Sequence, residues 1–299
     1  MLKIKEVKPK IGFIGSDRQS ILKDLNFAIK NGFDCYEIQA VKEPKGEVDF
    51  NLKPVIINQV KKISKENNIF LSLHISHFVS LCSANHEISK EALEFAKKEV
   101  ILAKEVGAKQ ITIHGGTKDT QNNENTVAKN FEILIKNLKE IIKLSKEFRI
   151  KIGLENAFDP SRLCRKPEDL LKVVNSVNPV RKGKGSGLYT TSRPSQGAGL
   201  SNGVKGLGIT FDIGHANVIN FDPIEYFRKV KKFVINMHLH DNDSITDQHV
   251  LFGEGNIDFK TLLRECKNSN YYGPFIFEVF PHENVLKAKE IFLNLWNQI

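Results

Sequence analysis

The sequence lacks the features that mark secreted, membrane-spanning and disulfide-rich proteins. Its four cysteines lie far apart and form no C-x-x-C pair, which argues against a disulfide framework or a thiolate zinc site and fits a reducing compartment. No stretch approaches the ~18 apolar residues that a membrane-spanning helix needs. The first residues, MLKIKEVKPKIGFIGS, contain no apolar core followed by small residues, so no signal peptide is expected. We therefore expect a cytoplasmic protein with no membrane partner.

Short apolar segments alternate with longer amphipathic segments along the whole chain. The expected strands are rich in Ile, Val or Phe, as strands buried on both faces are, and they span residues 11–15, 35–39, 70–76, 110–116, 151–157, 207–216, 234–241 and 274–280. The expected helices fill the intervals, at about 19–31, 54–67, 89–106, 125–148, 167–176, 222–231, 258–269 and 283–297. In the clearest of them, Ser89 is a plausible N-terminal cap and Gly107 a C-terminal stop.

Eight strands that alternate with eight helices predict an α/β chain folded as a single (β/α)8 TIM barrel over residues 1–299. A doubly wound open sheet is the alternative. It is disfavoured because no glycine-rich phosphate loop follows the first strand, where IGFIGSDRQS is the nearest approach.

Acidic residues are missing from residues 178–206, which contain five basic residues and seven glycines. We expect a flexible insertion between the fifth helix and the sixth strand, on the barrel face opposite the active site. A nucleic-acid or subunit contact is the alternative role. Without these five charges the net charge of +9 falls to an ordinary surplus of four, so charge gives only weak support for nucleic-acid binding.

Histidines and carboxylates gather at the predicted carboxyl ends of the strands, which meet at the catalytic mouth of a barrel. These residues are His74, His114, Glu155, Asp212, His215, His238, His240, Asp247, His249 and Glu278. Each alone could be hydrogen-bonded scaffolding. Together they place several carboxylates in a buried site. Because the strand-end motifs contain no Lys or Arg, these motifs offer no side-chain cation to neutralise that negative charge. Nitrogen and oxygen donors without thiolates predict a divalent metal centre, zinc or manganese.

Seven motifs follow one another in this chain: LHISHFVSL, GAKQITIHGG, IGLENAF, FDIGHAN, MHLHDND, DQHVLFGEGNIDF and FIFEV. In this order they resemble the xylose-isomerase-like barrel superfamily. That superfamily contains sugar and sugar-phosphate isomerases and epimerases, and also the endonuclease IV type of apurinic (AP) endonuclease, AP endonuclease family 2. The resemblance covers nearly the whole chain except the insertion.

The resemblance implies a site of one to three metal ions. Its implied core ligands are Glu155, Asp212, His238 and Glu278, and the ligands that would complete a trinuclear zinc site are His74, His114, His215, Asp247 and His249. Glu155 and Glu278 are the expected catalytic groups, and Glu37, His77 and His240 are expected to face the substrate. His86 is expected at the surface, and His282 is expected to be structural.

Two reactions are compatible with this resemblance. In the first, a divalent ion polarises the carbonyl of a sugar or sugar phosphate, and the paired glutamates move a proton through an enediolate. In the second, three zinc ions hydrolyse a phosphodiester in damaged DNA. The complete ligand set favours the hydrolase, whereas Glu37 and the segment GNIDFKTLLRECKNSNYYGPFIFEV resemble the sugar branch more closely.

The sequence therefore predicts a metal-dependent isomerase or epimerase, with a zinc-dependent AP endonuclease as the alternative. Another lyase or dehydratase on the same site and a non-enzymatic binding module are further alternatives. The module predicts acids paired internally, and the lack of nearby cations argues against it. The resemblance also suggests a homo-oligomer, and the sequence leaves the exact substrate open.

Overall fold

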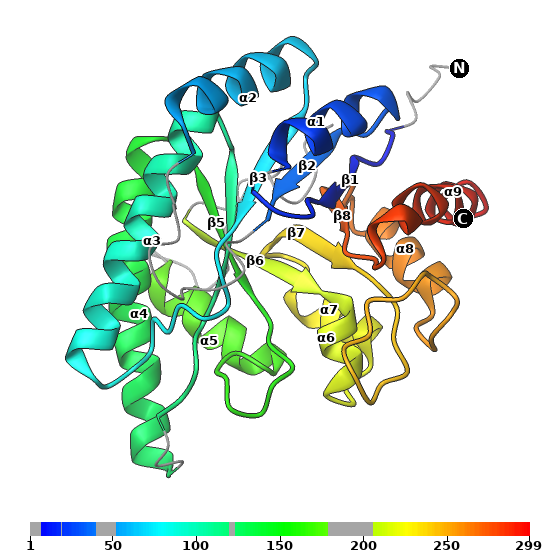
Figure 1. Ribbon diagram of the computed structural model, residues 1–299. Helices are drawn as coiled ribbons and strands as arrows, with labels where there is room; N and C mark the ends of the chain where they lie inside the picture. Colours follow the sequence, from blue (N-terminus) through cyan, green and yellow to red (C-terminus); the bar gives the residue numbers. More distant parts are fainter. Residues whose placement is uncertain (1–6, 19, 40–51, 120–122, 179–205) are drawn as a thin grey trace, which may run out of the picture.

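Eight parallel strands close into a barrel in the computed structural model, which describes residues 7–18, 20–39, 52–119, 123–178 and 206–299. Each strand pairs with its neighbours in the chain, and the last pairs with the first (Figure 1). The strands are β1 (Ile11–Ile14), β2 (Cys35–Ile38), β3 (Phe70–His74), β4 (Gln110–His114), β5 (Lys151–Glu155), β6 (Leu207–Asp212), β7 (Val234–Leu239) and β8 (Phe275–Phe277). The predicted TIM barrel is confirmed.

Helices surround the barrel on its outer side (Figure 1). They are α1 (Ile21–Lys30), α2 (Pro54–Glu66), α3 (His86–Val106), α4 (Glu124–Glu147), α5 (Pro167–Val177), α6 (Ile213–Val218), α7 (Pro223–Val230), α8 (Phe259–Asn268), the short 3-10 turn η2 (His282–Asn284) and α9 (Val285–Asn297). No helix in the described ranges combines the length and the apolar character that crossing a membrane requires. All but the two end residues of the predicted insertion, 178–206, lie outside the described residues.

Two predicted boundaries were wrong for local reasons. Helix α3 begins at His86 rather than at residue 89, because the Asn85 side chain accepts hydrogen bonds from the backbone N–H groups of Glu87 and Ile88 and is the actual cap. The sixth strand ends at Asp212, whose carboxylate caps the short helix α6 by accepting from the backbone N–H of His215 at 2.7 Å. The predicted stop at Gly107 is confirmed, since this residue has the left-handed φ of 86°.

The strands separate an apolar outer layer from a largely polar barrel interior. Alternate residues such as Ile152 and Leu154 of β5 belong to the main hydrophobic core that the helices cover. Inside the barrel, Glu37 accepts hydrogen bonds from Ser72 Oγ at 2.6 Å and Asn236 Nδ2 at 3.0 Å. A small apolar cluster of Ile14, Cys35 and Ile276 lies apart from the main core. Beneath the mouth, the barrel is therefore held together partly by hydrogen bonds between buried side chains.

Strands β5 and β6 approach so closely that position 153 has no room for a side chain. An ideal Cβ on Gly153 would overlap with Thr210 Oγ1 and lie 3.2 Å from the Thr210 backbone nitrogen. Thr210 Oγ1 itself hydrogen-bonds Thr112 Oγ1 at 3.0 Å. The glycine therefore makes room for the polar network in the interior.

We expect Gly153→Ala to lower the free energy of unfolding by about 1–3 kcal/mol, because the added methyl group overpacks the interior. Thr210→Ala should cost about 1 kcal/mol through the lost hydrogen bond. The double variant should lose less than the sum, because removing Oγ1 leaves the Thr210 Cβ 3.4 Å from the new methyl group. Urea unfolding measures all three, and strictly additive losses would contradict the close approach.

Candidate metal centre

A cavity of about 420 Å³ opens at the carboxyl ends of the strands. Its lining includes residues at the ends of β3, β4 and β5 and from the loops that follow β7 and β8. All nine predicted metal ligands lie at this mouth. Seven of them line the cavity, namely His74, His114, Glu155, His215, Asp247, His249 and Glu278. Asp212 and His238 lie at the adjoining ends of β6 and β7 and are completely buried.

Glu155 forms the first group with two imidazoles. Its Oε2 atom lies 3.2 Å from His74 Nε2 and 3.1 Å from His114 Nε2. The Nε2 atom of His114 is buried and has no hydrogen-bond partner among the described residues, despite that short distance. Burial lowers the pKa of His114 well below its usual value, which favours the neutral ring. A buried nitrogen without a hydrogen-bond partner and a carboxylate oxygen that face each other in this way fit a shared cation.

His238 lies at the centre of the second group. Its Nδ1 atom is 2.9 Å from Glu155 Oε1, 3.1 Å from Glu278 Oε1 and 3.9 Å from Asp212 Oδ2. Glu155, Asp212 and His238 form one group whose donor atoms could hold an ion, while Glu278 shares another group with His238, His74 and Glu37. Glu155 belongs to both groups, because its two oxygens face different imidazoles.

The third group lies towards the loop between β7 and α8. Asp247 Oδ2 is 3.0 Å from His249 Nε2 and 3.5 Å from His215 Nε2. Its other oxygen, Oδ1, is buried and has no hydrogen-bond partner in the described part of the chain. The structure thus brings the predicted ligands together at one mouth, in overlapping groups of donors that also include Glu37 and His240.

In four imidazoles, the ring nitrogen that points away from the candidate metal ligands contacts a hydrogen-bond acceptor. The Nδ1 atoms of His74, His215 and His249 lie 2.8–3.0 Å from the backbone oxygens of Ile75, Asn156 and Glu278. His238 Nε2 lies 2.9 Å from Glu37 Oε1. Since carbonyl and carboxylate oxygens only accept, each ring donates outwards and directs its second nitrogen at the carboxylates. This is the arrangement that orients histidines in metal sites.

The pKa values of the imidazoles show how strongly the cluster requires positive charge. Burial would lower the pKa of His215, but Asp212 and Asp247 raise it to about 10. Burial is likewise outweighed at His249, where Asp247 raises the pKa to about 9. The pKa of His238 is raised by Glu278, Glu37 and Glu155. Protons on these rings supply charge that a divalent cation can supply instead.

The two expected catalytic glutamates have pKa values that move in opposite directions. Burial acts to raise the pKa of Glu155, but His114 and His238 lower it well below its usual value. Burial raises the pKa of Glu278 despite the opposing effect of His238 and His249. Oε1 of Glu278 is also buried without a hydrogen-bond partner in the described residues. Paired groups with divergent pKa values are typical of acid–base catalysis.

The residues expected to face the substrate lie in different places. His77 does line the cavity. Glu37 lies completely buried below it, where its contacts are Ser72, Asn236 and His238, so its expected substrate contact is corrected to support of a ligand. His240 is also completely buried, with Nε2 3.1 Å from Asp212 Oδ1 and its ring stacked 3.8 Å from that of His249. It does not line the cavity, but it belongs to two of the groups of donors that could hold an ion.

The two remaining histidines lie where the sequence places them. His86 is exposed at the start of α3. His282 packs against the ring of Phe13, and its Nε2 atom lies 3.2 Å from the Ile14 backbone oxygen.

Sequence reasoning missed three residues at the mouth. Asn156 exchanges two hydrogen bonds of 2.8 Å with the Asp212 backbone, which joins the ends of β5 and β6. Gly214 is required because a Cβ there would overlap with the ring of His240. Arg162 lines the cavity and contributes a positive charge that the strand-end motifs lack. Only the position of Asn156, next to Glu155, is a signal in the sequence.

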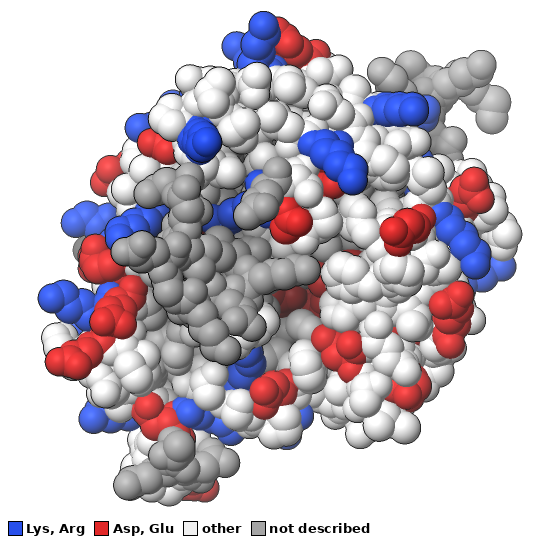
Figure 2. All heavy atoms as spheres, in the orientation of Figure 1, with Lys and Arg blue, Asp and Glu red and all other residues white. Residues whose placement is uncertain are grey.

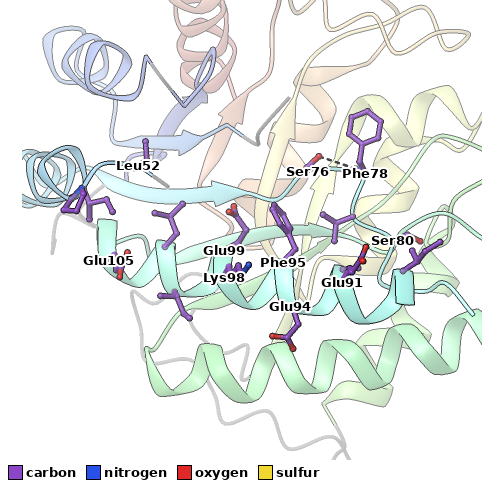
Figure 3. A pocket seen from close by; sticks show the side chains of 17 residues that line it. Leu52, Ser76, Phe78, Ser80, Glu91, Glu94, Phe95, Lys98, Glu99 and Glu105 are labelled. Atoms are coloured by element: carbon purple, nitrogen blue, oxygen red, sulfur yellow. Dashed lines mark hydrogen bonds between the residues drawn. The ribbon is translucent and has the colours of Figure 1, made fainter. Parts of the chain in front are cut away.

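A larger groove of about 1010 Å³ runs along α3, beside α2 (Figure 3). Its described lining contains apolar residues such as Phe95 and charged residues such as Glu94, Lys98 and Glu105, but no histidine or cysteine. On the face seen in Figure 2, basic and acidic side chains of the described residues are interspersed. The convergent donors therefore identify the smaller cavity as the candidate site.

The chain is similar to known proteins over most of its length. The family model described as "Xylose isomerase-like TIM barrel" matches residues 25–294. A probable endonuclease 4 of Acholeplasma laidlawii is 23% identical over 237 residues, covering 74% of this chain and 71% of that protein. L-ribulose-5-phosphate 3-epimerase UlaE of Escherichia coli is 22% identical over 280 residues, covering 90% and 87%.

Among solved structures, a D-tagatose 3-epimerase-like protein superposes with a TM-score of 0.74 at 25% identity, covering 97% of this chain and 98% of that one. The family model alone accounts for the whole barrel except its first strand and its last few residues. This chain therefore belongs to the xylose isomerase-like TIM barrel family.

Proposed function

We propose that this protein is a divalent-metal-dependent isomerase or epimerase of a small keto sugar or sugar phosphate. The observation that carries the proposal is the pair of buried glutamates, Glu155 and Glu278, that both contact one imidazole nitrogen. His238 Nδ1 lies 2.9 Å from the first and 3.1 Å from the second. Their pKa values diverge, and both side chains line the same cavity.

The metal would be held by Glu155, Asp212, His238 and Glu278. The buried Glu278 Oε1, which has no hydrogen-bond partner among the described residues, fits this assignment. A bound divalent ion would polarise a carbonyl group and acidify the neighbouring C–H bond. His74, His114, His215, Asp247 and His249 surround this core and are available for further ions or for substrate oxygens.

The chain's own residues would carry the proton. Glu155, which is ionised and lines the cavity, would remove a proton from the carbon next to the carbonyl. Glu278, whose pKa is raised, is suited to hold a proton and return it from another direction. Return to the opposite face inverts the carbon and gives epimerisation. The cavity volume of about 420 Å³ is in the range of small-molecule sites.

The relatives support the same class of reaction. The similar proteins named above include an L-ribulose-5-phosphate 3-epimerase, and a D-tagatose 3-epimerase-like protein shares the fold over nearly the whole chain.

A panel of keto sugars and their phosphates, incubated with the metal-loaded protein in deuterated water, tests the proposal. We expect deuterium at the carbon next to the carbonyl of one substrate, loss of exchange on chelation, and recovery with zinc or manganese. Glu155→Gln and Glu278→Gln should each lower kcat by roughly 10²–10⁴-fold, the usual contribution of a positioned acid or base. Mass spectrometry and NMR measure the exchange.

Glu147→Gln, an exposed change at the end of α4, is the matched control and should retain full exchange. Metal content measured for each variant separates lost chemistry from lost metal. No exchange with any ketose, combined with cleavage of an abasic duplex that Glu155→Gln abolishes, would contradict the proposal.

A zinc-dependent AP endonuclease is the second candidate. The observation that favours it is that all nine expected zinc ligands belong to overlapping groups of donors that could hold ions, with Glu155 and Asp212 each in two of them. Three ions suit phosphodiester hydrolysis, because one activates water while the others stabilise charge on the phosphate and the leaving group. Three zinc ions per chain by elemental analysis would support this candidate, and one ion would support the isomerase.

Glu37→Gln should weaken zinc binding by about 10–100-fold, the usual effect of removing a supporting carboxylate. The amide can donate to His238 Nε2, which would move the ring proton to Nδ1 and remove the lone pair that faces Glu155. Competition with a chromophoric chelator measures the affinity. Glu66→Gln on the surface of α2 is the control, and an unchanged affinity in Glu37→Gln would show that the carboxylate does not orient the ligand.

Zinc binding near pH 7 should release protons. The pKa values of His215 and His249, about 10 and about 9, lie above the ~6.5 of an unfolded chain. These protons are therefore bound at pH 7 and lost only as the pH rises through 9 and 10, so the apparent zinc affinity should increase across that range. Calorimetry in two buffers with different ionisation enthalpies measures the release, and equal heats in both would contradict the prediction.

A further inference from the structure

The cavity wall contains one strongly basic side chain. Among the described residues that line it, Arg162 is the single Lys or Arg, whereas Glu155, Asp159, Asp247 and Glu278 supply carboxylates. The proton-transfer chemistry proposed above gives this guanidinium no role. It lies in the loop between β5 and α5, apart from the nine candidate ligands in the chain.

The backbone around Arg162 is held firmly. It forms an antiparallel bridge with Thr117 in the loop after β4. Backbone hydrogen bonds on both sides complete the pairing, from Lys118 to Ser161 at 2.8 Å and from Leu163 to Gly116 at 3.2 Å. The Cα–Cβ direction of Arg162 is therefore fixed by two loops at once, which reduces the entropy lost when its side chain binds a ligand.

The guanidinium itself is largely unused. One N–H group donates to the His77 backbone oxygen at 3.0 Å, and no carboxylate of the described chain lies within 4.0 Å of its nitrogens. The nearby Asp159 carboxylate accepts instead from the Ser161 backbone N–H at 2.7 Å. A guanidinium has five donors, so most of them remain available at the cavity.

We propose that Arg162 binds the phosphate group of a phosphorylated keto sugar, so that the substrate of this site is a sugar phosphate rather than a free sugar. This inference rests on the proposed function and names its substrate class. A planar guanidinium matches two phosphate oxygens at once. Because Arg162 is the single Lys or Arg among the described lining residues and is none of the candidate ligands, a phosphate bound to it would leave the carbonyl end of the substrate to Glu155 and Glu278.

The experiment compares binding of a pentulose 5-phosphate and of the same free pentulose to the metal-loaded protein by calorimetry, together with turnover of both. Arg162→Ala should weaken binding of the phosphorylated sugar by about tenfold to a hundredfold, the range for a charge-assisted hydrogen bond. Binding and kcat/KM of the free sugar should fall much less than those of the phosphorylated sugar. Arg162→Lys keeps the positive charge but not the paired donors of the guanidinium, so it should recover part of the lost affinity for the phosphorylated sugar.

Arg165→Ala is the matched control. This arginine lies three residues further along the same loop, where it donates to the Phe158 backbone oxygen at 3.0 Å, and it does not line the cavity. The Arg165→Ala protein should bind both sugars with the affinities of the unaltered protein.

The outcomes separate this inference from the proposed function. Equal weakening of both sugars in Arg162→Ala would show that Arg162 only supports the His77 loop and would overturn the inference, as would no change in either. Equal turnover of the free and the phosphorylated sugar by the unaltered protein would overturn the inference while the proposed function stands. Selective binding of the phosphorylated sugar without deuterium exchange would uphold it while the isomerase reaction fails. If Arg162→Ala lowered only the cleavage of an abasic duplex, both the inference and the proposed function would be overturned.

Discussion

The contacts between buried carboxylates and imidazoles at the barrel mouth determine what the surrounding structure must provide. Taking a carboxylate out of water is unfavourable unless positive charge or hydrogen bonds compensate for it. Here the compensation comes from rings such as His238, which is completely buried between Glu155 and Glu37. Each ring must keep its orientation, because a rotation would place two acceptors against each other. The acceptors behind the rings are therefore as necessary to the cluster as the ligands themselves.

This requirement explains why the inside of the barrel is polar. The network of Glu37, Ser72, Thr112 and Asn236 lies directly beneath the mouth and is linked by hydrogen bonds of 2.6–3.3 Å. Hydrogen bonds of this kind hold buried side chains in one orientation, although Asn236 Oδ1 has no partner among the described residues. Stability comes instead from the apolar layer between the strands and the helices. The fold thus separates the residues that stabilise it from those that carry its chemistry.

The same cluster is compatible with two reactions, and its surroundings select between them. A barrel of this kind determines where donors converge but not which substrate they meet. Groups outside the cluster, such as His77 and Arg162, shape the rest of the cavity. They belong to loops, which vary independently of the strands. Relatives named as an epimerase and as an endonuclease are both similar to this chain, consistent with that division.

The sequence by itself determined the barrel, the order of its strands and the convergence of His74, His114, Glu155 and Glu278 at one mouth. It did so because buried parallel strands have a distinctive composition and their carboxyl ends meet at one edge. It could not show that Glu37 lies behind His238, that His240 is buried against Asp212, or that Arg162 reaches the cavity. Those facts depend on side-chain orientations and on a loop pairing between residues 45 positions apart, Thr117 and Arg162. Only the packed tertiary structure decides them, because contacts between residues distant in the chain select one orientation from several that are locally equivalent.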